Sequence, residues 1–431
     1  MSTESPGIFG LLRRRRFLPF FVVQFGGAFN DNLYRNALLV LLVSGAVAAD
    51  RVNFWVNLAA GLFILPFFLF SPLAGQLADR CDKARLMRWV KGAEVLIMIA
   101  AALALWRHAW AWLLVLLFAM GAHSAFFGPL KYAILPQHLA AAELVTGNAL
   151  VGTGTFVAIL AGTIGGTLLA AGVDPELRVG VGVVLVALLG WWASAAVPPA
   201  PSQAPALRID WNPLRQFAVL YRLAAERRTV LAAVLGISWF WALGASYLTQ
   251  IPNFAVTVLG GAPPLIAVLL SAFVVGIGSG SLLCARLGGT HREPRLVTLG
   301  ALGLGLFGVD LALAAGVAGT PPVAGGWALA RILGDIVLLG ASGGLYVIPL
   351  YVRMQREAAD DRRARIIAFN NLLNALFMVA ASLLGMLVLG WLQRGIAEFF
   401  LLLTALHAVA ATLLLRAGSA ARRGALLGGL R

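Results

Sequence analysis

Long apolar runs alternate with short polar segments along the whole chain. Each run is long enough for a helix to cross the hydrocarbon core of a bilayer, which takes about 20 residues. Composition agrees, because only 12% of the residues are charged, whereas soluble domains usually contain about 25%. The pattern predicts an all-α membrane protein with twelve transmembrane helices, which we place at residues 17–47, 53–78, 86–106, 110–132, 146–172, 178–197, 229–257, 263–285, 295–317, 326–352, 367–391 and 397–416.

Arginine and lysine are concentrated in one alternate set of the polar segments. That set holds 26 of the 33 basic residues, whereas the opposite loops hold only Arg51, Arg107, Arg178 and Arg394. Basic loops stay on the cytoplasmic side of a membrane, so we expect both termini to be cytoplasmic. The net charge of +15 has the same origin, and we therefore expect no nucleic-acid partner.

A proline-rich segment divides the chain near its middle. Its four prolines, between residues 198 and 205, are typical of an extended linker. Residues 211–227 then follow an amphipathic pattern, which indicates either a helix in the membrane interface or a plain connector. We predict a basic N-terminus at 1–16, a six-helix bundle at 17–197, a cytoplasmic linker at 198–228, a second six-helix bundle at 229–416 and a basic tail at 417–431.

The two halves contain related segments. Residues 117–129 resemble residues 338–349, and in both copies a charged loop and then an asparagine-containing apolar segment follow. Six plus six spans around a central linker are typical of secondary transporters of the major facilitator type, so we expect the major facilitator fold. In such proteins the halves are related by an axis along the membrane normal, and substrate binds near the midplane.

The first apolar run carries an acid and a base near its middle. Asp31 is followed one helical turn later by Arg35. An ionised side chain at bilayer depth costs about 2.5 to 3.5 kcal/mol. The two residues therefore predict a polar pathway that a substrate uses. The alternative is that they simply neutralise each other at i, i+4 spacing.

Residues 75–85, between the second and third spans, resemble the major facilitator signature G-x-L-a-D-[RK]-x-G-[RK]-[RK], although Asp82 and Ala84 depart from it. The Asp79 carboxylate can accept from helix N-terminal amides or from a neighbouring base, which would latch the cytoplasmic side shut in one state. An ordinary basic loop is the alternative. Glu94, close to Lys91, serves either packing and gating or substrate contact. The candidate gating residues are Gly75, Asp79, Arg80, Lys83, Arg85 and Glu94.

Residues 24–32, 71–79, 127–136 and 148–150 together resemble the bacterial lysophospholipid transporter family. The resemblance is strong over 17–172 and weak after the linker. That family occurs as a free transporter and as the front part of fusions with an acyltransferase and an acyl-carrier-protein ligase. No such region follows here, so we expect a stand-alone, monomeric transporter of the bacterial inner membrane, with an acyltransferase or acyl-ACP ligase as a candidate partner.

The resemblance implies that the chain moves lysophospholipids from the outer to the cytoplasmic leaflet, where they are reacylated. Asp31 would attract an amine of the head group, and Arg35 or Lys131 a phosphate. Lys131 can alternatively snorkel to the interface, and the amides can simply join helices. The candidate substrate-binding residues are Asp31, Arg35, Asn30, Asn32, Asn36, Lys131, Asn148, Asn370 and Asn371.

Three charged residues in the second half are candidates for ion coupling. Asp310 stands alone in its span, whereas Arg331 and Asp335 are spaced as an i, i+4 pair; structural roles are the alternative. No H-E-x-x-H, P-loop or H-x-x-x-x-D motif is present, so we expect no enzyme, cofactor or metal. Two rival functions stay open: a proton-coupled transporter of small amphiphiles, drugs or metabolites, and a non-transport subunit of a membrane acyltransferase complex.

Overall fold

The computed structural model describes residues 8–46, 51–261, 263–287, 293–317 and 326–428. Within these ranges the ordered elements are helices and no strand occurs. Two helices, α5 (Leu135–His138) and α8 (Pro213–Ala225), are short. The twelve long helices of the described chain are α1 (Leu18–Leu41), α2 (Val52–Arg80), α3 (Lys83–Trp106), α4 (Trp110–Ala133), α6 (Leu144–Ala170), α7 (Pro175–Ala195), α9 (Arg228–Thr257), α10 (Pro263–Leu287), α11 (Glu293–Val317), α12 (Gly326–Glu357), α13 (Arg363–Gly385) and α14 (Ile396–Gly428).

Eleven of these helices, counted over the described residues, are long and apolar enough to cross a membrane. The twelfth long helix is α1, in which the polar residues at 30–36 lower the hydropathy. Its 24 residues nevertheless extend over about 36 Å, which exceeds the thickness of a hydrocarbon core. The predicted fold class, an all-α membrane protein, is confirmed.

The chain divides into two compact units. The first unit consists of Met1–Gly147, Gly154–Leu223 and Ala358–Leu372, and the second of Asn148–Thr153, Ala224–Glu357 and Leu373–Arg431. The first turns of α13 therefore belong with the N-terminal helices, and a short stretch of α6 belongs with the C-terminal ones. The predicted domain boundaries stay a prediction.

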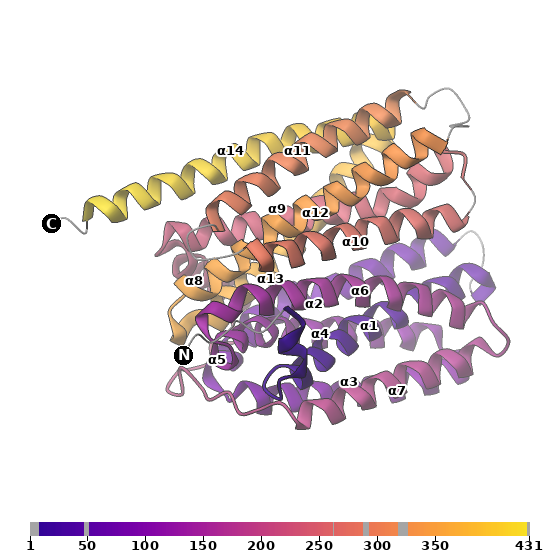
Figure 1. Cartoon of the computed structure of the whole chain (residues 1–431). Coiled ribbons are helices and arrows are strands. Elements are labelled where there is room, and N and C mark those ends of the chain that lie inside the picture. The colour runs from indigo at the N-terminus through magenta and orange to yellow at the C-terminus, as the bar shows by residue number, and fades with distance from the viewer. Residues whose placement is uncertain (1–7, 47–50, 262, 288–292, 318–325, 429–431) are drawn as a thin grey trace. The chain divides into compact units, whose positions relative to one another are not determined.

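In the first unit, α1 and α3 both pack against α7, and α2 packs against α4 (Figure 1). The Tyr34 hydroxyl lies in the apolar core of this unit and donates to the Leu113 carbonyl (2.7 Å). Helix α6 approaches the α1 backbone so closely that a Cβ at Gly162 would lie 2.3 Å from the Phe29 oxygen. These contacts fix the rotation of α1 and thus the direction in which its polar residues face.

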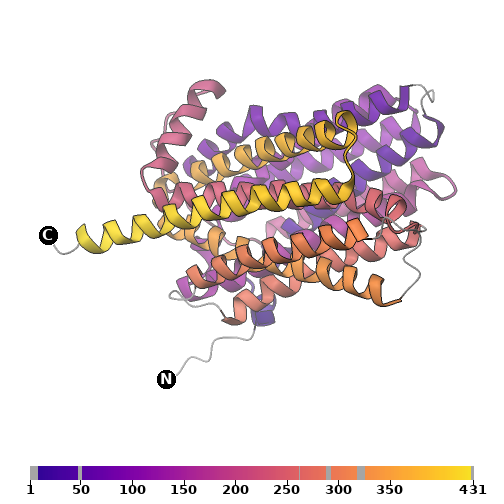
Figure 2. The same ribbon diagram turned by 90° about the horizontal axis from the view of Figure 1, so that it is seen from above.

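In the second unit, α12 packs against α9, α10 and α11, and α14 packs against α9 and α11. Helices α10 and α12 are in close contact, because a Cβ at Gly280 would lie 2.0 Å from the Ala341 carbonyl oxygen. Figure 2 shows α14, in yellow, as an unbroken helix along its neighbours. Small residues at such crossings allow the backbones of membrane helices to approach.

Candidate functional site

Asp31 and Arg35 on α1 have separate partners. The Ser124 hydroxyl of α4 donates to Asp31 Oδ2 (2.6 Å), and Asp31 Oδ1 is buried without a hydrogen-bond partner. Arg35 donates to Asn32 Oδ1 (2.9 Å), and its guanidinium carbon lies 5.3 Å from the centre of the Phe63 ring. The described side chains include no direct Asp31–Arg35 ion pair, although the two charges still interact at longer range, and the substrate role of the two residues stays a prediction.

Two asparagines of α1 join helices. The Asn30 amide donates to Glu94 Oε1 (2.8 Å) and to the Val183 carbonyl of α7 (3.2 Å). The Asn36 amide donates to the Thr163 carbonyl (2.9 Å) and to a threonine hydroxyl, both on α6. Asn32 donates to the Ala28 carbonyl within α1 (2.8 Å). These contacts are structural, and a substrate role for the three amides stays a prediction.

A buried charged cluster on α3 and α4 contacts α1 through Asn30. Glu94 forms an ion pair with Lys91 on α3, and neither side chain is exposed. His123 Nε2 of α4 lies 3.2 Å from Glu94 Oε2. Buried charges of this kind persist only when they are paired, because desolvation is costly. The contacts favour the packing interpretation of Glu94, and its gating role stays a prediction.

Lys131 on α4 belongs to a second polar chain that links three helices. Its ammonium group donates to Thr155 Oγ1 on α6 (2.6 Å), and the Thr155 hydroxyl donates to Gln24 Oε1 on α1 (3.2 Å). Lys131 is 9% exposed, so it does not snorkel to water in this structure. The Gln24 amide nitrogen is buried without a hydrogen-bond partner in the described chain.

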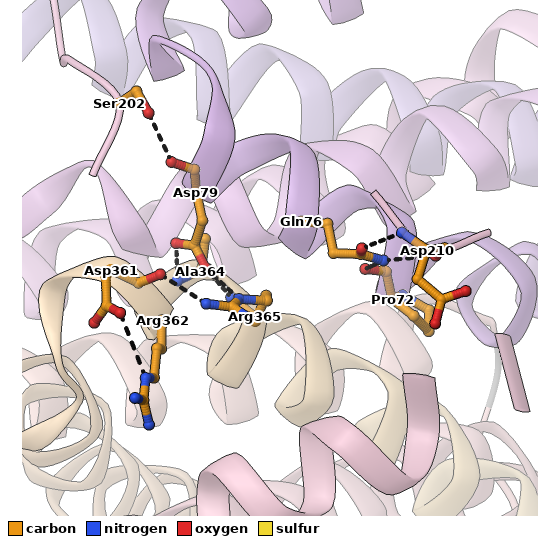
Figure 3. Close-up of polar contacts among 9 residues, drawn as sticks. All are labelled: Pro72, Gln76, Asp79, Ser202, Asp210, Asp361, Arg362, Ala364 and Arg365. Carbon is orange, nitrogen blue, oxygen red and sulfur yellow. Dashed lines mark hydrogen bonds and ion pairs between the residues drawn. The ribbon is translucent and has the colours of Figure 1, made fainter. Parts of the chain in front are cut away.

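The Asp79 carboxylate, at the end of α2, binds the N-terminus of α13 (Figure 3). It accepts from the backbone amides of Ala364 (2.9 Å) and Arg365 (3.2 Å) and from Arg365 Nε (3.0 Å). The amides of a first helical turn lack partners within the helix and carry the positive end of its dipole. Helix amides and a neighbouring base were the two partner types predicted for Asp79, and both are present. We call this set of contacts the Asp79 latch.

Gly75 brings α2 against α13 one turn before Asp79. A Cβ at Gly75 would lie 2.6 Å from the Ala368 Cβ and 2.9 Å from the Arg365 Cα. No side chain fits at this crossing without moving one of the helices. Gly75 is therefore part of the geometry that lets the latch close, although its gating role remains a prediction.

The linker is bound along the same end of α2. The Asp79 carbonyl accepts from the backbone amides of Gln203 and Ala204 and from the Ser202 hydroxyl. The Gln76 side chain donates to the Asp210 carbonyl (3.0 Å) and accepts from the Asp210 amide (2.8 Å). Figure 3 shows the Asp79–Ser202 and Gln76–Asp210 contacts on one stretch of α2.

The departure from the family signature at Asp82 has a local cause. Asp82 caps the N-terminus of α3, with Oδ1 accepting from the Arg85 amide (2.8 Å), and its Oδ2 accepts from the Ala200 amide (2.9 Å). The Lys83 side chain is buried and its ammonium has no hydrogen-bond partner in the described chain. Arg80 and Arg85 are exposed, and their gating role stays a prediction.

The remaining candidate amides lie on α6 and α13. Asn148 and Gln355 are buried and exchange two hydrogen bonds (2.7 and 3.0 Å) between α6 and α12. Asn370 is fully buried, and the Asn371 amide nitrogen would lie 2.1 Å from a Cβ at Gly128 on α4. Asn148 is thus helix-joining in this structure, and the substrate roles of the three asparagines stay predictions.

The ion pairing of the charged residues in the second unit differs from the pairing that their sequence spacing predicts. Arg331 forms its ion pair with Asp310 on α11, so Asp310 does not stand alone, and the predicted Arg331–Asp335 pair is wrong. Asp335 is buried, and its carboxyl interacts with that of Asp310. Rotation of α12 about its axis, which spacing does not reveal, turns Arg331 toward α11.

The family model of the Major Facilitator Superfamily matches residues 20–382. The chain belongs to the Major Facilitator Superfamily. Among curated relatives, it is 27% identical over 373 residues to the lysophospholipid transporter LplT of Cronobacter sakazakii, with 83% of each chain covered. It is 28% identical over 382 residues to the protein of that name from Serratia proteamaculans, with 86% of this chain and 87% of that protein covered.

Solved structures of the superfamily have the same fold. The human organic anion transporter MFSD10 matches with a TM-score of 0.75 at 16% identity, covering 93% of this chain and 99% of that one. The Escherichia coli fucose:proton symporter matches with a TM-score of 0.69 at 15% identity, covering 94% and 99%. The resemblance predicted from the motifs is therefore confirmed, and this superfamily member is a membrane transporter and not an enzyme.

Sequence reasoning missed Gln24 and Thr155 in this transporter. At 100° per residue, Gln24, Asp31 and Arg35 lie within about 40° on one face of α1, which was the available signal for Gln24. No sequence signal pointed to Thr155, because threonine is common in apolar helices. Among the described residues, no group of three or more His, Cys, Asp or Glu side chains could hold a metal ion.

Proposed function

We propose that this transporter moves lysophospholipids from the outer to the inner leaflet of the bacterial inner membrane by alternating access. Both termini are cytoplasmic in this proposal, and a separate acyltransferase or acyl-ACP ligase reacylates the delivered lipid. The observation that carries the proposal is the similarity to curated lysophospholipid transporters over 83% of both chains. Two polar side chains of the first unit, Asp31 with an unbonded oxygen and the buried Lys131, supply chemistry that such a substrate would need.

A lysophospholipid has a phosphate, often an amine, and one acyl chain. Asp31 Oδ1, which is buried without a partner, is the acceptor that an ammonium head group needs. Lys131 and Gln24 supply donors for the phosphate, since charge-assisted bonds to phosphate are the strong ones. Arg35 is a second cation on the same face of α1. The acyl chain needs only an apolar wall or the surrounding lipid.

The Asp79 latch gives this proposal a gate. With the latch closed, the amides of α13 and the Arg365 guanidinium hold the end of α2. Opening it would free α2 from α13 and expose the cytoplasmic side of the pathway. The two six-helix bundles, proposed at 17–197 and 229–416, would then exchange between outward-open and inward-open states.

Head-group chemistry tests the assignment of the binding residues. We would add radiolabelled lysophosphatidylethanolamine or lysophosphatidylglycerol to proteoliposomes and measure the fraction that albumin no longer extracts. Asp31→Asn should reduce transfer of the amine-bearing lipid about 10- to 150-fold, the equivalent of one charge-assisted hydrogen bond. It should affect the glycerol lipid much less. Lys131→Gln should reduce transfer of both lipids, because both carry a phosphate.

Asp174→Asn is the matched control, because Asp174 is exposed in the turn before α7 and its left-handed backbone suits asparagine. It should transfer both lipids at the wild-type rate. Wild-type protein that transfers neither lipid would reject the proposed function, whereas transfer unaffected by Asp31→Asn and Lys131→Gln would reject only the proposed site.

The second unit favours one alternative, a proton-coupled transporter of small amphiphiles. Buried Asp335 interacts with Asp310, which Arg331 pairs, and such carboxyl groups inside a membrane are typical of proton pathways. Collapsing the proton gradient would abolish accumulation of a small soluble substrate in that case. Lysophospholipid transfer that continues unchanged without a gradient would reject this alternative.

A further inference from the structure

Helix α8 of the linker packs through only one of its faces. Gln216, Leu220 and Ala224, spaced by four residues, are buried. The helix has 13 residues, or about 20 Å, so it is too short to cross a hydrocarbon core. Its exposed side chains therefore do not belong to the lipid-facing surface of a spanning helix, and they require a separate explanation.

The exposed face of α8 is apolar. Leu214, Ala218 and Tyr221 are spaced i, i+4 and i+7 on α8 and are exposed, and Trp211, also exposed, lies two residues before the helix begins. Leu214 is 84% exposed and Trp211 is 75% exposed. We call these four residues the apolar arc. Exposed apolar side chains gathered along a helix outside the spans and just before its start mark a surface that something covers.

Arginines border the apolar arc on the side away from the protein. Arg215 and Arg222 are seven residues apart, so they point the same way, and both are exposed. Arg215 Nε lies 3.5 Å from Asp210 Oδ2 but its side chain remains 75% exposed, which leaves donors for another anion. Arg222 forms no ion pair with the described residues.

Contacts within the first unit hold α8 in this orientation. The rings of Phe217 and Tyr221 lie 5.8 and 6.4 Å, centre to centre, from the Phe369 ring of α13. At the start of the helix, Asp210 exchanges hydrogen bonds with Gln76 of α2 and accepts from the Gln216 side chain. The Asn212 amide and the Gln216 amide lower the pKa of the Asp210 carboxyl, which keeps this anchor ionised.

We infer that α8 lies in the head-group layer of the membrane, with its apolar arc at the acyl boundary and Arg215 and Arg222 bound to anionic phospholipid head groups. A helix with an apolar strip and flanking arginines has the chemistry of an interfacial membrane helix. A protein partner fits less well, because both arginines would need matching carboxylates beside a narrow apolar strip. The inference does not depend on which substrate is transported.

Fluorescence quenching tests the position of the apolar arc. We would attach bimane to Leu214→Cys in the full chain carrying Cys81→Ser and Cys284→Ser, reconstituted in vesicles. Nitroxide-bearing phospholipid should quench this label and aqueous iodide should not. A label at Ala218→Cys should behave in the same way and replaces the first if Leu214→Cys folds poorly. Iodide that quenches the label freely, with no quenching by lipid nitroxide, would overturn the inference and leave a protein as the occupant.

The same bimane label tests whether Arg215 and Arg222 bind anionic lipid. Nitroxide-bearing phosphatidylglycerol should quench at least about twofold more than nitroxide-bearing phosphatidylcholine at equal mole fraction, because anionic lipid gathers at the arginines. Replacing Arg215 and Arg222 by glutamine should make the two lipids equal, whereas the Arg222→Lys control should keep the difference. Equal quenching in the parent protein would overturn the proposed head-group binding.

Discussion

Removing one charge from the Asp79 latch should open it without disturbing the rest of the bundle. Asp79→Asn keeps the size of the side chain but replaces one carboxylate oxygen by an amide. In the native structure Oδ1 accepts from the Ala364 amide, and Oδ2 accepts from the backbone amide and Nε of Arg365. An asparagine can satisfy the first donor, but its nitrogen then faces the two donors of Arg365.

The size of the effect follows from these contacts. Removing one partner of a buried, hydrogen-bonded charge pair costs about 3 to 5 kcal/mol. Asp79 is unexposed and the Arg365 side chain is only 12% exposed. Solvent screening therefore reduces this free-energy cost only slightly. The lower figure, about 3 kcal/mol, changes a two-state equilibrium roughly 150-fold. A protein that is latched about 99% of the time would then be latched about 40% of the time.

Distance measurements by pulsed electron paramagnetic resonance detect such a change. Spin labels on Cys81 and on Asp361→Cys lie on either side of the latch, with Cys284→Ser preventing a third label. Asp79→Asn should add a second, longer distance to the single population of the parent. Asp82→Asn is the control, because asparagine still caps α3 and Asp82 does not bind α13. An unchanged distance distribution in Asp79→Asn would refute the latch.

Three further substitutions address packing and gating. Glu94→Gln leaves Lys91 buried without its counter-charge, so thermal unfolding in detergent should show a loss of about 3 kcal/mol, whereas the exposed Glu398→Gln should be neutral. Gly75→Ala places a methyl group against α13. It should increase the fraction of molecules that show the longer distance in the spin-label experiment. Asn148→Leu removes both hydrogen bonds to α12 and should destabilise the protein by about 1 to 3 kcal/mol, measured by the same unfolding assay.

The helices were predictable because their signals are local. Apolar runs predict spans wherever they occur, and even α1, whose hydropathy is lowered by its polar residues, was recognised from its length. The acceptor role of Asp79 was predictable from the signature, but its partners were not, since Ala364 is 285 residues away. The ion-pair partner of Arg331 was not predictable from residue spacing. Spacing predicted a bond to Asp335, yet the side chain reaches Asp310 because helix rotation is set by packing between helices.

Glu94 and Asp31 look alike in the sequence, because each is an acid in an apolar helix. They differ in whether both carboxylate oxygens accept hydrogen bonds. Glu94 accepts from Asn30 and Lys91 and contacts His123, so folding alone accounts for it. Asp31 has one bonded oxygen and one buried oxygen without a partner. A buried acceptor that lacks a partner costs about 1 to 3 kcal/mol and more when charged, so folding alone would favour its replacement. The unsatisfied oxygen therefore favours Asp31 over Glu94 as the acid that meets a transported head group.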